Sequence, residues 1–141
     1  MRIVAWGLSD TGSKREHNED SLLLSPELDL YAVADGMGGH AAGDRASRLA
    51  VEVLESKLRD SNLDEEPQRS PGLDDAPGQY LAEAAREASR SISDEAQQNP
   101  DAKGMGTTLT AILLRRGRLY LAHVGDSRCY LFRDGRIEQL T

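Results

Sequence analysis

A short apolar run that ends in an acidic, glycine-rich segment constrains the fold of this chain most strongly. The run Leu28–Ala34 has the composition of a buried strand, and Asp35-Gly36-Met37-Gly38-Gly39-His40 follows it directly. A strand that ends in a carboxylate and an accessible backbone carbonyl offers oxygen ligands, which Mg²⁺ and Mn²⁺ prefer. An Asp-Gly pair also marks ordinary turns. This segment alone therefore leaves a metal site and a plain turn as alternatives.

Apolar patterns on both sides of this segment predict strands and two helices. Helical spacing predicts helices from about Asp44 to Arg59 and from about Gln79 to Gln97. Both faces of 118–124 are largely apolar, which favours a sheet stacked on a second sheet with helices outside. Asp134-Gly135 predicts a tight hairpin turn. Strands are expected at Ile3–Leu8, Leu22–Leu24, Leu28–Ala34, Thr107–Leu114, Arg118–Val124 and Arg128–Arg133.

Length and charge limit the classes of function. The 141 residues suffice for one domain or part of one, and 24 acidic against 17 basic residues argue against a nucleic-acid partner. Cys129 is the sole cysteine and is expected to be a small core residue. No apolar stretch is long enough to span a membrane, so a cytoplasmic protein is expected, although a longer parent could carry an anchor. The acidic, Pro- and Gly-rich segment 60–78 is predicted to be a surface loop.

Charged residues gather at the predicted strand ends and turns. If these ends share one edge of a sandwich, several carboxylates meet, and clustered carboxylates favour a bound cation. The alternative is a set of separate, solvated turns. The charged residues concerned are Arg15, Glu19, Asp20, Asp35, which Gly36 follows, and Asp126, which Gly125 precedes.

Four motifs give the chain a family resemblance. Their order along the chain makes the set specific, whereas any one alone would not be. With these four motifs in this order, the chain resembles the N-terminal part of a PP2C-type (PPM) metal-dependent protein serine/threonine phosphatase of the bacterial kind. The motifs are Arg15-Glu16-His17-Asn18-Glu19-Asp20, Val33-Ala34-Asp35-Gly36-Met37-Gly38-Gly39-His40, Gly104-Met105-Gly106-Thr107-Thr108 and Val124-Gly125-Asp126-Ser127-Arg128.

The resemblance implies an α+β fold, an αββα sandwich with a metal centre at one edge of its two sheets. Asp35 then matches a carboxylate that bridges two Mn²⁺ or Mg²⁺ ions, and the Gly36 carbonyl matches a ligand of one of them. Glu19 and Asp20 match acids that hold metal-bound water or lie just behind the ligands. Asp126 matches a ligand of a third, weaker ion.

The resemblance also implies roles outside the metal ligands. Arg15 matches an arginine that binds the phosphate of the substrate. His40 is a candidate general acid, because imidazole titrates near neutral pH; the alternative is a loop histidine near the metal. His17 and His123 are expected to be structural, and the Gly-Thr-Thr turn and Ser127-Arg128 are expected to support the fold.

The implied function is hydrolysis of phosphoserine and phosphothreonine in proteins by a metal-activated bridging water, with substrates of serine/threonine kinases as partners. Family members continue beyond the point matching Thr141 with further Asp-containing motifs. The chain is therefore expected to be a partial domain, residues 1–141, with little or no activity alone. A non-catalytic, partner-binding PP2C-like module is the alternative.

Overall fold

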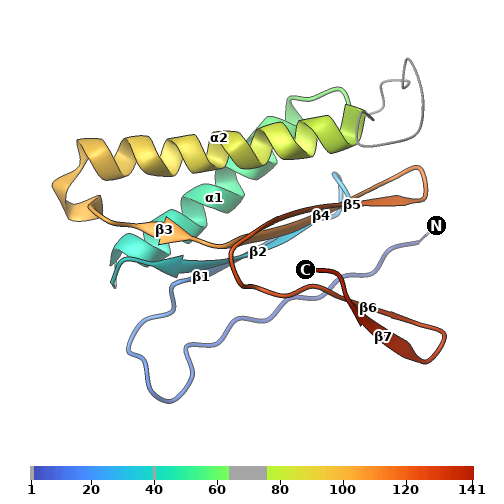
Figure 1. Cartoon of the computed structure of the whole chain (residues 1–141), viewed down its shortest axis with the longest axis horizontal. Helices are drawn as coiled ribbons and strands as arrows, with labels where there is room; N and C mark the ends of the chain where they lie inside the picture. Colours follow the sequence, from blue (N-terminus) through green and yellow to red (C-terminus); the bar gives the residue numbers. More distant parts are fainter. Residues whose placement is uncertain (1, 40, 64–75) are drawn as a thin grey trace.

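An antiparallel sheet of five strands, with two helices on one face, forms the centre of the structure (Figure 1). The computed structural model describes residues 2–39, 41–63 and 76–141. The strand order is β1-β2-β4-β5, and the short β3 also pairs with β2. A separate two-stranded sheet contains β6 and β7. The strands are β1 (Asp20–Ser25), β2 (Leu30–Met37), β3 (Gly106–Thr107), β4 (Leu109–Arg115), β5 (Arg118–Val124), β6 (Tyr130–Arg133) and β7 (Arg136–Gln139).

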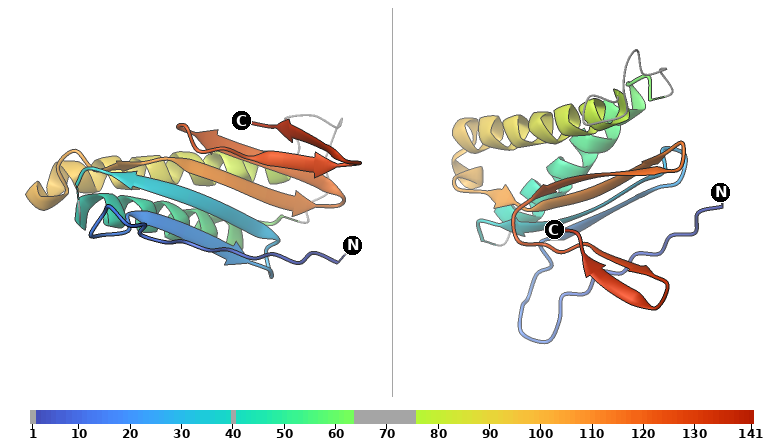
Figure 2. Two further views of the ribbon diagram at one scale, coloured as in Figure 1. Left: turned by 90° about the horizontal axis from the view of Figure 1, so that it is seen from below. Right: turned by 45° about the vertical axis from the view of Figure 1, so that its right-hand side comes forward.

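Both helices pack on the same face of the sheet (Figures 1 and 2). Helix α1 spans Ala41–Arg59 and helix α2 spans Ala76–Gln98. A short 3₁₀ turn, Pro100–Ala102, follows α2. Apolar residues at helical spacing form the buried side of each helix. These residues include Ala46, Ala50, Leu54 and Leu58 in α1, and Leu81, Ala84 and Ala88 in α2.

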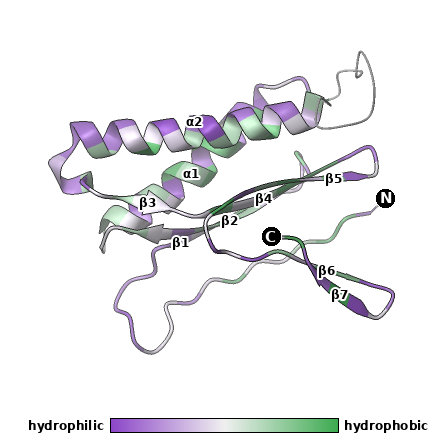
Figure 3. Ribbon diagram, in the orientation of Figure 1, coloured by the Kyte–Doolittle hydropathy of each residue, from purple (hydrophilic) through white to green (hydrophobic). Residues whose placement is uncertain are grey.

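Strand β2 shows how the sheet separates its two faces. Side chains alternate along a strand, and the buried positions of β2 are Leu30, Ala32, Ala34 and Gly36. Asp35 alternates with these positions and therefore faces away from the helices. Figure 3 shows hydrophobic residues along the central strands and hydrophilic residues along the outer side of α2. The predicted α+β class is confirmed; the described residues supply one helical layer.

The predicted strand Ile3–Leu8 is wrong. The described residues 2–10 form no regular secondary structure and run past the face of the sheet that lacks helices (Figure 2). Gly7 lies against Leu22 and Leu24 of β1, whose Cδ1 atoms are 3.2 and 3.3 Å from the position of an ideal Cβ on Gly7. Apolar composition suits a strand, but a strand also needs backbone hydrogen-bond partners. Residues 2–10 pair with no strand among the described residues.

Several predicted boundaries also shift. β2 runs on through Asp35 and Gly36 to Met37, because Gly36 and Met37 pair with β3. The strand predicted at 107–114 is interrupted at Thr108. Helix α1 begins at Ala41 and α2 at Ala76, three residues before the predicted starts. β6 begins at Tyr130, and β7 follows the expected turn, where Asp134 and Gly135 have φ of 52° and 74°.

The segment 60–78 is only partly described. Residues 64–75 lie outside the described residues, and 76–78 belong to α2, so the predicted loop is too long at that end. Pro77 lies in the first turn of α2, where a proline costs no helical hydrogen bond. Cys129 was predicted to be a small core residue, and it is only partly buried. Among the described residues, no helix combines the length and hydropathy needed to cross a membrane.

Candidate metal centre

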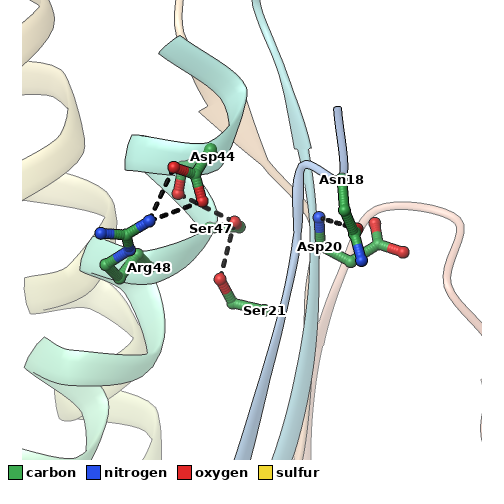
Figure 4. A network of polar contacts seen from close by, with 6 residues as sticks. All are labelled: Asn18, Asp20, Ser21, Asp44, Ser47 and Arg48. Carbon is green, nitrogen blue, oxygen red and sulfur yellow. Dashed lines mark hydrogen bonds and ion pairs between the residues drawn. The ribbon is translucent and has the colours of Figure 1, made fainter. Parts of the chain in front are cut away.

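Two aspartates face each other across β1 and β2. Asp20 and Asp35 are direct partners in the antiparallel register. Directly opposed residues on antiparallel strands project to the same face of the sheet. Figure 4 shows the Asp20 side chain pointing away from α1, while the neighbouring Ser21 points toward it. The Asn18 side chain fixes the start of β1, because its Oδ1 accepts the Asp20 N–H at 3.0 Å.

The electrostatics of this pair favour a cation. Burial raises the pKa of Asp20, and the charge and a hydrogen bond of Asp35 raise it further. The positive charge of Arg15 lowers that pKa, and the charge of Glu19 raises it. Arg15, Glu19 and Asp35 therefore all lie close enough to Asp20 for their charges to act on it. A cation at this point would relieve the repulsion between the carboxylates.

A second group of oxygens lies on the helix side of β2. An ideal Cβ on Gly43, in the first turn of α1, would lie 1.9 Å from Glu19 Oε2 and 3.1 Å from the carbonyl carbon of Gly36. The Glu19 carboxylate and the Gly36 peptide thus occupy the space beside one glycine. An ideal Cβ on Gly36 would lie 2.0 Å from the Gly43 carbonyl oxygen, so β2 and α1 approach this closely only because both residues are glycine.

The turn Gly125-Asp126-Ser127 joins the same end of the sheet through Thr108. The Thr108 Oγ1 accepts the Asp35 N–H at 2.9 Å and lies 2.8 Å from Ser127 Oγ. Asp126 itself is exposed. Its carboxylate makes no hydrogen bond or ion pair with the described residues.

The predicted ligands Glu19, Asp20, Asp35 and Gly36 therefore lie at one end of the sheet, to which Thr108 links the Asp126 turn, but they do not form one cluster. Among the described residues, no three His, Cys, Asp or Glu side chains lie close enough together to hold a metal ion. Arg15 is exposed, on the segment that leads into β1. His40 lies outside the described residues. His123 accepts or donates a hydrogen bond at Nδ1 with Thr110 Oγ1, 2.9 Å away, within the sheet.

Sequence reasoning missed a polar link between β1 and α1. Ser21 Oγ lies 2.9 Å from Ser47 Oγ, and the Ser47 hydroxyl also donates to the Asp44 carbonyl at 3.1 Å (Figure 4). Arg48 makes a two-pronged contact with the Asp44 carboxylate at 2.7 and 2.9 Å. Ser47 lies on the buried side of α1 between Ala46 and Ala50. A serine among the apolar residues of a helix was the sequence feature that could have indicated this link.

Comparison with known proteins identifies the family. A family model described as "Protein phosphatase 2C" matches residues 12–141. The chain belongs to the protein phosphatase 2C family. PstP of Mycobacterium tuberculosis, a serine/threonine protein phosphatase, is 45% identical over 136 residues, which cover 94% of this chain and 23% of that protein. The serine/threonine phosphatase stp of Listeria welshimeri is 36% identical over 138 residues, covering 94% and 51%.

Solved structures of protein phosphatase 2C relatives confirm the predicted fold. A crystal structure of the catalytic domain of PstP in complex with two manganese ions matches with a TM-score of 0.78 and 42% identity. The match covers 95% of this chain and 53% of that one. The chain thus spans about half the length of the structures it matches, and the PP2C-like α+β fold is shown over that part.

Proposed function

We propose that the protein acts as a metal-dependent protein serine/threonine phosphatase that hydrolyses phosphoserine and phosphothreonine in proteins. The facing pair Asp20 and Asp35, on the neighbouring strands β1 and β2 of a protein phosphatase 2C chain, carries this proposal. Relatives that cover nearly the whole chain are named as phosphatases of this specificity. The link to particular kinases and the cytoplasmic location stay predictions from the sequence.

The oxygens present suit Mn²⁺ or Mg²⁺, which prefer carboxylate and carbonyl ligands. In this proposal Asp35 and the Gly36 carbonyl bind the ions directly, Asp20 and Glu19 stand beside them, and Asp126 holds a third ion. The raised pKa of Asp20 and the glycine-lined space beside Glu19 and Gly36 support that assignment. A PstP structure in complex with two manganese ions supports Mn²⁺. Bound divalent ions supply an acidified water and neutralise charge on the phosphoryl group.

Arg15 is proposed to bind the phosphate of the substrate. Its guanidinium can form two parallel hydrogen bonds to phosphate oxygens. Its charge already acts on Asp20, so it lies near the candidate ligands in the absence of substrate. Its exposure leaves the guanidinium open to a phosphoprotein.

His40 is proposed as the group that protonates the leaving hydroxyl, and this part rests on the sequence alone. The test compares His40→Ala on phenyl phosphates of high and low leaving-group pKa. A penalty confined to the poorer leaving group supports the role, because only that group needs a proton as the bond breaks. An equal penalty on both substrates contradicts it.

A non-catalytic, partner-binding module is the second candidate. One observation favours it: the described residues hold no cluster of three side-chain ligands. Such a module would show no specific stabilisation by Mn²⁺, whereas a functional site should, because a ligand that binds only the folded state raises its stability.

The decisive experiment follows Mn²⁺-dependent stability and phosphopeptide hydrolysis in the same preparations. We expect Mn²⁺ to raise the melting temperature of the wild type and to support slow turnover that a chelator removes. Asp35→Asn should lose both responses. Asp94→Asn is the control, since Asp94 is exposed on α2, the helix outside the candidate site. Hydrolysis that proceeds equally well with chelator would overturn the proposed function.

A further inference from the structure

Thr108 occupies an interruption between β3 and β4, directly opposite Asp35. The register of β2 with β3 and with β4 is the same on both sides of this point. At Thr108, however, the side chain replaces the backbone as acceptor: Oγ1 accepts the Asp35 N–H at 2.9 Å. The Thr108 N–H donates to the Asp35 carbonyl at 2.9 Å. One residue therefore satisfies both backbone polar groups of Asp35.

The other side of the same side chain contacts the turn that holds Asp126. Thr108 Oγ1 lies 2.8 Å from Ser127 Oγ, within hydrogen-bond distance. Its Cγ2 methyl group fills the space where Gly125 would carry a side chain, 2.7 Å from the position of an ideal Cβ. Gly125 has φ of +104°, a conformation open to glycine and strained for other residues. The turn Gly125-Asp126-Ser127 thus packs against the Thr108 methyl group and lies within hydrogen-bond distance of the Thr108 hydroxyl.

We propose that Thr108 is a positioning residue that fixes the Asp126 turn relative to Asp35 and thereby sets the affinity for the divalent cation. The inference rests on the proposed function, which makes both aspartates ligands. Asp126 needs such a link, because its own carboxylate has no partner among the described residues. A hydroxyl shared by a ligand's backbone and a neighbouring turn acts as an outer support of a metal site, and loss of such supports typically weakens metal binding.

Threonine variants separate the two contributions. Thr108→Val keeps the shape against Gly125 and removes the hydroxyl. Thr108→Ser keeps the hydroxyl and removes the methyl group. Thr110→Val is the matched control, because Thr110 lies on β4 two residues away and its hydroxyl bonds His123 Nδ1 at 2.9 Å instead of the candidate ligands.

The test measures Mn²⁺ binding, by electron paramagnetic resonance of free Mn²⁺, and hydrogen exchange of backbone amides. We expect Thr108→Val to bind Mn²⁺ about 10-fold to 100-fold more weakly than the wild type. Thr108→Ser and Thr110→Val should stay close to the wild type in affinity. Asp126→Asn should have a smaller effect in the Thr108→Val background than in the wild type, because coupled residues are not additive. Equal Mn²⁺ affinity of Thr108→Val and the wild type would overturn the proposal.

Hydrogen exchange distinguishes failure of this inference from failure of the proposed function. In metal-free protein, Thr108→Val should lose protection at the Asp35 amide, and unchanged protection would overturn the inference whatever the metal result. A wild type that binds no Mn²⁺ would overturn the proposed function and, with it, the role of Thr108 in metal affinity. If Thr108→Val does not fold, Ser127→Ala decides, since it removes only the contact to the turn and should also weaken Mn²⁺ binding.

Discussion

The two faces of the main sheet differ in how completely they are covered. On the helical face, Leu30, Leu54, Leu58 and Leu113 are fully buried. The opposite face meets the segment 2–19 and the β6–β7 hairpin (Figure 2). Large apolar residues there remain open to solvent: Trp6, Leu8, Phe132 and Ile137 are each at least 70% exposed. The helical face therefore buries more apolar surface and is expected to contribute most of the stability, and the open face carries the facing aspartates.

The hairpin shows why the open face contributes less. β6 and β7 pair with each other and not with the main sheet. Hydrogen bonds next to the hairpin join the residues just before β6 to the residues just after β7. The Leu140 N–H donates to the Cys129 carbonyl, and the Cys129 N–H donates to Thr141 Oγ1. A two-stranded sheet without a covering layer is only marginally stable in water. Four substitutions can test this difference between the faces.

Leu54→Ala should have the largest effect on stability. Leu54 is fully buried between α1 and the sheet, so truncation loses apolar burial and leaves a cavity. We expect a loss of about 2–5 kcal/mol in the free energy of unfolding. Urea denaturation measures it, with Ser56→Ala, an exposed position of the same helix, as control. A loss below that of Phe132→Ala would contradict the comparison of the two faces.

Gly36→Ala should cause the second-largest loss in the free energy of unfolding, and it should also disturb the candidate metal centre. The added methyl group would meet the Gly43 carbonyl oxygen at 2.0 Å, and backbone atoms cannot rotate away as a side chain can. Overpacking of this kind costs about 1–3 kcal/mol, and α1 and Glu19 must shift with it. Urea denaturation and Mn²⁺ titration should both register the change. Met37→Ala is the neighbouring control, because the Met37 side chain is largely exposed and its truncation adds no atom to the contact between β2 and α1.

Phe132→Ala should change the free energy of unfolding by less than about 0.5 kcal/mol. The Phe132 side chain is 72% exposed, so its removal leaves no cavity and little apolar burial is lost. The same urea denaturation series measures it beside Leu54→Ala. A cost comparable to Leu54→Ala would show that the hairpin is packed far more firmly than the structure indicates.

The sequence predicted the covered part of the molecule better than the open part. The helices could be predicted because their buried residues recur with the helical period. β5 could be predicted from its apolar composition, although it is an edge strand without a fully buried residue. Ile3–Leu8 failed because its apolar pattern says nothing about whether a hydrogen-bonding partner exists. Asp35 was expected at a turn, yet it lies inside β2, since β3 supplies a partner from far along the chain.

The candidate site was predictable to a similar degree. The sequence located Asp20, Asp35 and Asp126 at or near predicted strand ends and turns, and it left open whether these carboxylates meet. It could not indicate that Asp20 and Asp35 face each other, which depends on register. The role of Thr108 was equally hidden, since it depends on a side chain that bonds two segments distant in sequence.

Asp20→Asn should have the smallest effect and the opposite sign. The raised pKa of Asp20 means that the folded state holds this proton more firmly than the unfolded state does. Folding stability is therefore lost as pH rises from the ordinary value of 3.8 through the raised pKa, and the ionised group is destabilising at neutral pH. Without metal, Asp20→Asn should slightly raise the melting temperature at pH 7 and leave it unchanged well below pH 3.8.

Added Mn²⁺ should reverse this order, because the wild type then gains from an ion that its paired carboxylates attract, and the variant gains less. Melting curves at several pH values, with chelator and with Mn²⁺, measure both parts. Asp94→Asn on α2 serves as control, since it removes one negative charge from an exposed helical position outside the candidate site. A variant that melts lower than the wild type in chelator at pH 7 would mean that the Asp20 carboxylate stabilises the open face, contrary to the repulsion inferred from its facing Asp35.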